Sequence, residues 1–283
     1  DSRLDDVHFD ANAVRKHCNK MRPKFSSGPD DCPPFLLKKI GPAIADIIAQ
    51  LFQSFMSIGR VPSDWKQAII KPLFKKGASS DPASYRPISL TSIFSKLMEK
   101  IIVEQMLKYL LTNNLISKQQ HGFLSRRSTA TNLIESLNDW TVKMENRQGQ
   151  SVAYIDFAKA FDSVSHPKLL TKLLVYGIGG VLLNWISDFL TGRSHVTRVG
   201  HCLSPIAFIT SGVIQGSCLG PLLFLLYIND LAEAISAVAT MKLYADDVKL
   251  YSNMSDVPSN ANVLQDQLNR LLERYVVWQL LYH

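Results

Sequence analysis

Hydrophobic positions along the chain follow two periods, and the elements they predict do not alternate regularly. Apolar residues recur every three or four positions in five segments, which predicts helices over 41–58, 92–111, 167–176, 179–191 and 263–278. Shorter apolar runs predict strands at 65–74 and 151–157 and hairpins within 195–210 and 242–251. Because these elements show no βαβ repeat, the expected fold class is α+β.

Several segments carry more specific predictions. The apolar face of the helix over 41–58 is expected to hold Ile44, Ile47, Ile48 and Leu51. Residues 1–40 are polar and rich in proline, which predicts an extended lead-in. The apolar run Leu219–Ile228 is too short to cross a membrane, so it predicts a buried element within a helix over 221–235.

The last predicted helix has leucines at helical spacing, namely Leu264, Leu268, Leu271 and Leu272. That apolar face is expected to cover a sheet. The closing residues WQLLYH would then be left without a partner strand.

Charge divides the chain unevenly. The net charge of +7 separates into +8 for residues 1–150 (22 Lys and Arg minus 14 Asp and Glu) and −1 for residues 151–283 (9 minus 10). A basic half and an acidic half suit a phosphate-binding lobe beside a metal-binding lobe, although a solvated lysine-rich face explains the asymmetry equally well. The four cysteines form no CxxC pair and there is no signal pattern, which predicts an intracellular protein with reduced thiols.

Two carboxylate motifs stand at the ends of predicted strands. Tyr244-Ala245-Asp246-Asp247 places two adjacent acids at a hairpin tip, and Asp156 follows the apolar run 153–155. Taken alone, the acids of the hairpin tip are ordinarily explained as a solvated turn, and Asp156 is ordinarily explained as a helix cap. If the two strands lie side by side, Asp156 and Asp246 converge, and converging carboxylates need a cation such as Mg²⁺. Two ions roughly 3.5–4 Å apart would then support phosphoryl transfer.

Two further segments suit nucleotide binding. The glycines around Gln215 in SGVIQG allow a backbone to approach a ligand closely, and a turn capping the next helix is an equal alternative. The basic turn with Lys75, Lys76 and Arg86 could close over a triphosphate. Ordinary surface charge explains any one of these three side chains more simply.

In this order, the segments resemble the reverse transcriptases of non-LTR (LINE-type) retrotransposons over nearly the whole chain. The matching stretches are SSGPDDCPPFLLKK, WKQAIIKPLFKKG, YRPISLTSIFSKLMEKII, QHGFLSRRST, AYIDFAKAFDSVSH, SGVIQGSCLGPLLFLLYINDL and LYADDVKLY. YADD alone is moderately specific, but the series of motifs is very specific. The resemblance therefore implies an RNA-directed DNA polymerase with a right-hand fold of fingers and palm.

The resemblance also implies functional residues. Asp156, Asp246 and Asp247 would be catalytic carboxylates and ligands of two Mg²⁺ ions, for which Mn²⁺ is a substitute. Phe161 would exclude a ribose 2′-hydroxyl and so select dNTPs. The nucleotide-binding set is Lys75, Arg86, Phe157, Phe161, Gln215 and Gly216. The template-binding set is Gln120, Gly122, Phe123 and Arg126.

The implied organisation is a lead-in and fingers over 1–150 and a palm over 151–283, with 171–210 as a helical and hairpin insertion. The family continues to a primer grip and a thumb, so we expect the thumb to be absent and processive synthesis by this chain to be weak. Expected partners are an RNA template, a DNA primer and dNTPs, without a membrane. The parent protein is expected in nucleus and cytoplasm. The alternatives are a truncated, catalytically inactive nucleic-acid-binding remnant, or a group II intron or other cellular reverse transcriptase.

Overall fold

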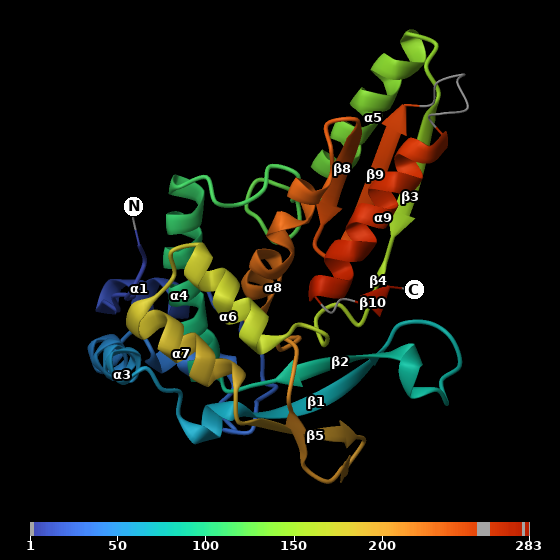
Figure 1. The fold of residues 1–283 in the computed structure, drawn as a ribbon. Coiled ribbons are helices and arrows are strands. Elements are labelled where there is room, and N and C mark those ends of the chain that lie inside the picture. Colours follow the sequence, from blue (N-terminus) through green and yellow to red (C-terminus); the bar gives the residue numbers. More distant parts are fainter. Residues whose placement is uncertain (1–2, 254–260, 279–280, 283) are drawn as a thin grey trace. The chain divides into compact units, whose positions relative to one another are not determined.

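The chain folds into two compact units, each assembled from two separate stretches of sequence. The first combines Asp1–Asn113 with Leu170–Pro221, and the second combines Asn114–Leu169 with Leu222–His283. A computed structural model describes residues 3–253, 261–278 and 281–282 (Figure 1). Helices and sheets are mixed along the chain without a βαβ repeat, as predicted from the sequence.

Helices dominate the first unit. They are α1 (Ala11–Asn19), α2 (Pro34–Ile40), α3 (Ala45–Ile58), α4 (Ile93–Thr112) and α7 (Gly180–Leu190), and α6 (His166–Val175) enters this unit at Leu170. The four helices predicted between residues 41 and 191 are therefore confirmed. The prediction of an extended lead-in over residues 1–40 is wrong. The Asp10 side chain caps α1 by accepting the N–H of Ala13, and Pro34 opens α2, where its missing N–H costs nothing.

The buried face of α3 differs from the predicted one. Ile47 is 67% exposed and Leu51 is 44% exposed, whereas Phe52 is completely buried. The Phe52 ring packs edge-on against Phe9 and Trp65, with ring centroids 5.7 and 6.0 Å away. Ile48 of the predicted face is buried beside Phe52, so the helix is rotated to place this aromatic ring in the core.

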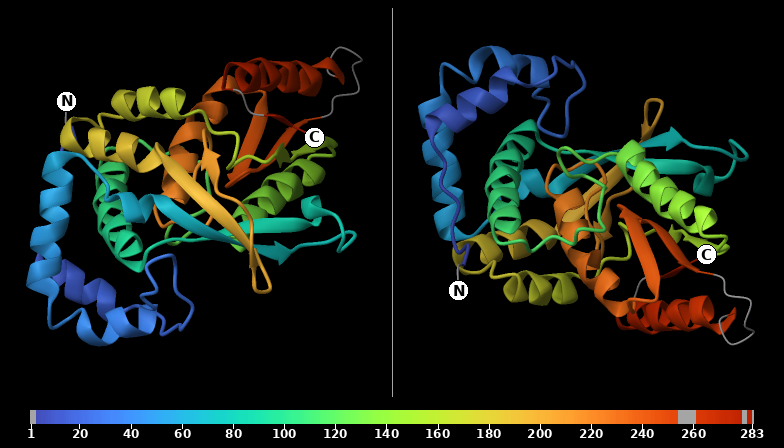
Figure 2. Two further views of the ribbon diagram at one scale, coloured as in Figure 1. Left: turned by 90° about the horizontal axis from the view of Figure 1, so that it is seen from below. Right: turned by 90° about the horizontal axis from the view of Figure 1, so that it is seen from above.

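A mixed sheet completes the first unit. Its strands are β1 (Gln67–Phe74), β2 (Tyr85–Leu90), β5 (Arg193–Val199), β6 (Cys202–Leu203) and β7 (Ala207–Ile209). β1 pairs antiparallel with β2 and parallel with β5 (Figure 2). In the parallel pair, Ile69 lies opposite Val196. β7 pairs antiparallel with β5, which confirms the predicted hairpin. β2 was not predicted, because the proline and serine residues of the preceding segment are typical of a turn and give no signal for the start of a strand.

The second unit is built on an antiparallel sheet with the strand order β3-β9-β8. Its elements are α5 (Thr129–Glu145), β3 (Gln150–Ile155), β8 (Ala239–Tyr244), β9 (Asp247–Asn253) and α9 (Ala261–Trp278). α9 packs against β8 and β9, as predicted, and buries Leu271. The predicted leucine face is only partly correct, because Leu272 is 36% exposed and Gln267 is buried. The expectation that the closing residues lack a partner strand is wrong, since β10 (Leu281–Tyr282) pairs with β4 (Phe157–Ala158).

The apolar run Leu219–Ile228 is a buried element, as predicted. It forms α8 (Gly220–Ile228), and a 3₁₀ helix over Asn229–Ala234 replaces the predicted continuation. Every side chain from Leu222 to Ile228 is buried. Among the residues that the structure describes, no helix combines the length and the apolar character that crossing a membrane requires.

Candidate active site

The two carboxylate motifs meet at one end of the β3-β9-β8 sheet. β8 and β9 form the predicted hairpin, whose last pair is Tyr244 opposite Asp247, with Ala245 and Asp246 in the turn. On the other side of β9, the last pair is Ile155 opposite Val248. Asp156 directly follows β3, so a continuation of this register would place it next to Asp247.

A cavity of about 390 Å³ opens at this end of the sheet. Asp156 and Asp247 both line it, together with Tyr154, Tyr244, Lys242 and Lys249. Both of these carboxylates are solvent-exposed, and Asp246 is half-buried. The two lysines bring positive charge to the cavity, and one of them, Lys242, also pairs with Glu135. This end of the sheet therefore offers exposed acidic oxygens and cationic side chains together.

The donor set fits a magnesium ion that is completed by substrate. Within the described residues, no group of three or more His, Cys, Asp or Glu residues is placed to hold a metal ion by itself. Mg²⁺ prefers hard oxygen ligands, keeps several waters, and is usually bound through one or two carboxylates and substrate phosphates. Asp156 and Asp247 in one cavity match that requirement.

Aromatic side chains predicted to touch the nucleotide occupy different environments. Phe161 is half-buried and stacks on Phe224 at 4.5 Å between centroids, and Phe123 meets its ring edge-on at 6.1 Å. Phe157 is only 4% exposed, and its ring packs against Tyr275. Phe161 therefore keeps an accessible ring held by two neighbours, whereas the ring of Phe157 belongs to the core.

The predicted template segment lies against the carboxylate hairpin. Gln120 is 2% exposed, and its side-chain oxygen accepts the N–H groups of Gly122 and Ala245. A Cβ on Gly122 would lie 2.3 Å from the Ala245 nitrogen, so only glycine fits there. Phe123 and Arg126 both have positive φ, at 56° and 64°. These two strained residues turn the segment sharply, and both of their side chains are exposed.

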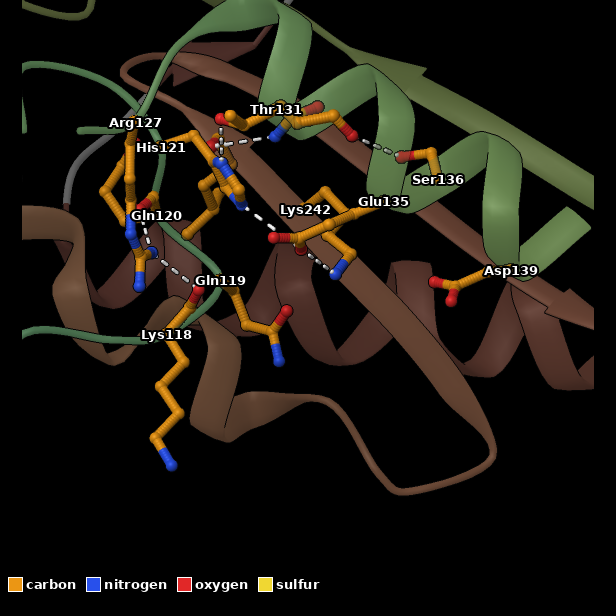
Figure 3. A network of polar contacts seen from close by, with 12 residues as sticks. Lys118, Gln119, Gln120, His121, Arg127, Thr131, Glu135, Ser136, Asp139 and Lys242 are labelled. Carbon is orange, nitrogen blue, oxygen red and sulfur yellow. Dashed lines mark hydrogen bonds and ion pairs between the residues drawn. The ribbon is translucent and has the colours of Figure 1, made fainter.

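A polar network that sequence reasoning missed ties this segment to α5 and β8 (Figure 3). The buried His121 ring lies 3.1 Å from the Thr131 hydroxyl and 3.4 Å from Glu135, and Lys242 donates to the same Glu135 oxygen at 2.6 Å. Burial lowers the pKa of His121, while the hydrogen bond from Lys242 lowers the pKa of Glu135. A neutral imidazole therefore sits beside an ion pair. No local pattern in the sequence marks these residues as neighbours.

The predicted nucleotide-binding residues of the first unit stand on β2 and its surroundings. Leu73 pairs with Arg86 across the β1–β2 hairpin, and Lys75 donates its backbone N–H to Ser84 at 2.8 Å. The Lys75 and Arg86 side chains are both exposed. Both cationic side chains therefore stand on one hairpin, two positions apart along its pairing.

The loop holding Gln215 and Gly216 is fixed from two sides. The Gln215 carbonyl accepts the Ser89 N–H at 2.8 Å, and a Cβ on Gly216 (φ 119°) would lie 2.5 Å from the Ser89 oxygen. On the other side, the buried Glu99 carboxylate accepts the N–H groups of Cys218 and Leu219 at 2.6 and 3.1 Å. Sequence reasoning missed Glu99, because it lies in the middle of an apolar helix.

Residues 73–280 match the protein family described as reverse transcriptase (RNA-dependent DNA polymerase). Three curated relatives are polymerases of mobile elements. The RNA-directed DNA polymerase from mobile element jockey of Drosophila funebris is 28% identical over 277 residues, which is 94% of this chain and 30% of that protein. The jockey polymerase of Drosophila melanogaster is 30% identical over 82% of this chain and 26% of its own length. The probable polymerase from transposon BS of Drosophila melanogaster is 29% identical over 88% and 28%, respectively.

The chain thus spans less than a third of the length of each of these relatives. Their names agree with the resemblance drawn from the sequence motifs.

Proposed function

Because this chain belongs to the reverse transcriptase (RNA-dependent DNA polymerase) family, we propose that it is the polymerase domain of a non-LTR retrotransposon protein. In this proposal it joins a deoxynucleotide to a DNA primer on an RNA template. The observation that carries the proposal is the cavity lined by Asp156 and Asp247 at the end of the β3-β9-β8 sheet. Two exposed acids that line one cavity offer hard oxygen ligands to a divalent ion, and this supports a binding role.

The carboxylates would act by holding divalent ions, which reverse transcriptases generally use. Asp156 and Asp247 would bind from the two strands and Asp246 from the turn. Bound Mg²⁺ ions would supply positive charge that neutralises the phosphates and lowers the pKa of the primer hydroxyl. In the proposed reaction, the primer 3′-oxygen forms a bond to the α-phosphorus, the bond to the bridging oxygen breaks, and pyrophosphate leaves. The hydroxyl proton passes to water.

Other residues would bind the incoming nucleotide and the template. Lys75 and Arg86 would contact the triphosphate, since exposed cations on a hairpin can fold over phosphate oxygens. Phe161 would block a 2′-hydroxyl with the accessible part of its ring. In this proposal the first half of the chain is the fingers and the second half is the palm. The predicted roles of Phe157, Gln215 and Gly216 and of the template-binding residues Gly122, Phe123 and Arg126 stay part of the same proposal. The Gln120 side chain is only 2% exposed, so it is left out of the proposed template contacts.

Single-nucleotide addition tests the proposal directly. The 283-residue chain is incubated in excess over an RNA template with a labelled DNA primer, one complementary dNTP and Mg²⁺, at low salt. We expect addition of one nucleotide, lost at least 100-fold in Asp156→Asn. Asp162→Asn is the matched control, because Asp162 is an exposed aspartate that does not line the cavity, and it should keep wild-type activity. A folded wild-type chain that adds no nucleotide would replace this proposal with the inactive, nucleic-acid-binding alternative.

A further inference from the structure

The turn that carries Asp246 is held in an unfavourable backbone conformation. Ala245 has φ 56°, in the left-handed region that non-glycine residues rarely adopt. A residue held there costs of order 1–3 kcal/mol, and it persists only where the surroundings fix it. Ala245 is also 5% exposed, so water cannot satisfy its N–H. Some group of the protein must therefore stabilise this turn.

Gln120 supplies that group. Its side-chain oxygen accepts the Ala245 N–H at 2.9 Å and the Gly122 N–H at 2.7 Å. Two donors on one oxygen fix the orientation of the amide, because a flipped amide would present its NH₂ group to two N–H groups. The amide nitrogen has no hydrogen-bond partner in the described part of the chain.

The backbone around Gln120 is fixed to the same hairpin. Leu243 donates its N–H to Gln119 at 2.9 Å, and His121 donates its N–H to Leu243 at 2.8 Å. Asn132 adds a side-chain hydrogen bond to the Leu243 carbonyl at 3.2 Å. Residues 119–121 therefore continue the sheet beyond β8 as a short parallel bridge. This arrangement aims the Gln120 side chain at the turn.

We infer that Gln120 is a positioning residue for the carboxylate turn, holding Ala245 so that Asp246 and Asp247 keep the geometry that metal binding needs. This inference rests on the proposed function of those acids. Gln120 itself is buried and touches no substrate in this role. A displacement of about 1 Å at a catalytic group can lower a rate by about 100-fold, so we expect loss of the hydrogen bond to the turn to lower the rate strongly.

Metal affinity and backbone protection test the inference without requiring turnover. Gln120→Met keeps the size of the side chain and removes the acceptor. We expect its Mn²⁺ affinity, measured by electron paramagnetic resonance, to fall about tenfold, and its kcat for single-nucleotide addition to fall about 100-fold with the KM for dNTP within about twofold. Gln120→Glu retains acceptor oxygens, so its kcat should return to at least about half of the wild-type value. Gln119→Met is the matched control, since the Gln119 side chain takes no part in these hydrogen bonds.

The outcomes separate the inference from the function on which it rests. If the wild-type chain binds no Mn²⁺, or if the Asp246→Asn variant binds Mn²⁺ as well as the wild type does, the proposed function fails. If Mn²⁺ binds and Gln120→Met binds it as tightly as the wild type, only the inference fails. Hydrogen exchange of the Ala245 amide in the wild-type chain decides the matter should Gln120→Met not fold. Slow exchange is expected, and exchange at the rate of an unstructured peptide would overturn the inference.

Discussion

Removal of the Glu99 carboxylate should destabilise the protein severely. Glu99 is completely buried in α4, where it accepts the N–H groups of Cys218 and Leu219 and the hydroxyl of Ser95. Glu99→Ala leaves two backbone N–H groups buried and unpaired, and each costs about 1–3 kcal/mol. We therefore expect a loss of roughly 4 kcal/mol. At about 2–4 °C per kcal/mol for a chain of this size class, the melting temperature should fall by about 10 °C.

The assay is thermal unfolding followed by circular dichroism, with Glu104→Ala as the matched control. Glu104 lies on the same helix, but it is exposed and pairs with Lys16 and His17 at the surface. Exposed ion pairs contribute about 0–1 kcal/mol, so this variant should unfold near the wild-type temperature. Equal shifts for the two variants, or a Glu99→Ala shift under 2 °C, would refute the reasoning.

The pH dependence of the same site has a definite sign. Burial raises the pKa of Glu99 above its ordinary value of 4.5, so the folded protein binds this proton more tightly than the unfolded chain does. Its contribution to stability is therefore fully present below pH 4.5 and is lost as the pH rises through the raised pKa. Relative to Glu99→Gln, the wild-type protein should gain stability as the pH falls from neutral. A constant difference between the two proteins across that range would contradict this assignment.

Three further predictions concern other parts of the chain. Phe161→Ala should raise incorporation of ribonucleotides relative to deoxyribonucleotides in single-nucleotide addition, and unchanged discrimination would remove its role at the sugar. Arg86→Ala should raise the KM for dNTP about tenfold, as expected for the loss of one charge-assisted contact of about 1.4 kcal/mol. A control substitution at the exposed Lys108 should leave this KM unchanged. Burial holds the pKa of His121 below its ordinary value of 6.5. The contribution of this group to stability is therefore fully present above pH 6.5 and is lost as the pH falls through the lowered pKa. In denaturant titrations, His121→Gln should lose less stability than the wild type between pH 7 and 5.

Local sequence patterns predicted the elements whose buried face is apolar. The carboxylate hairpin and α7 follow this rule, α4 and α9 follow it apart from their buried Glu99 and Gln267, and the strand-end Asp156 follows from the apolar run before it. α5 does not. It buries Asn132 and Ser136 against the sheet and exposes Leu133 and Ile134, so its apolar period points away from the protein core. A helix with that inverted pattern cannot be recognised from hydrophobic spacing.

The supporting residues of the site could not be predicted for a different reason. Gln120 bonds to a residue 125 positions away, and Glu99 bonds to residues 119 and 120 positions away. Glutamine and glutamate are usually exposed, so their types give no sign of burial. Their roles depend on which distant backbone groups the fold brings near, which one sequence without its structure does not specify.

The parallel pairing of β1 with β5 has a consequence for synthesis on the ribosome. Ile69 pairs with Val196, so the central strand of the first unit stays incomplete until more than a hundred further residues have been made. A nascent chain that has reached only Asn113 exposes one edge of β1, and unpaired strand edges are templates for pairing with other chains. Such a polypeptide would have to be shielded by chaperones until the strand from Arg193 to Val199 emerges. Premature termination between these points should therefore yield aggregates instead of a smaller folded unit.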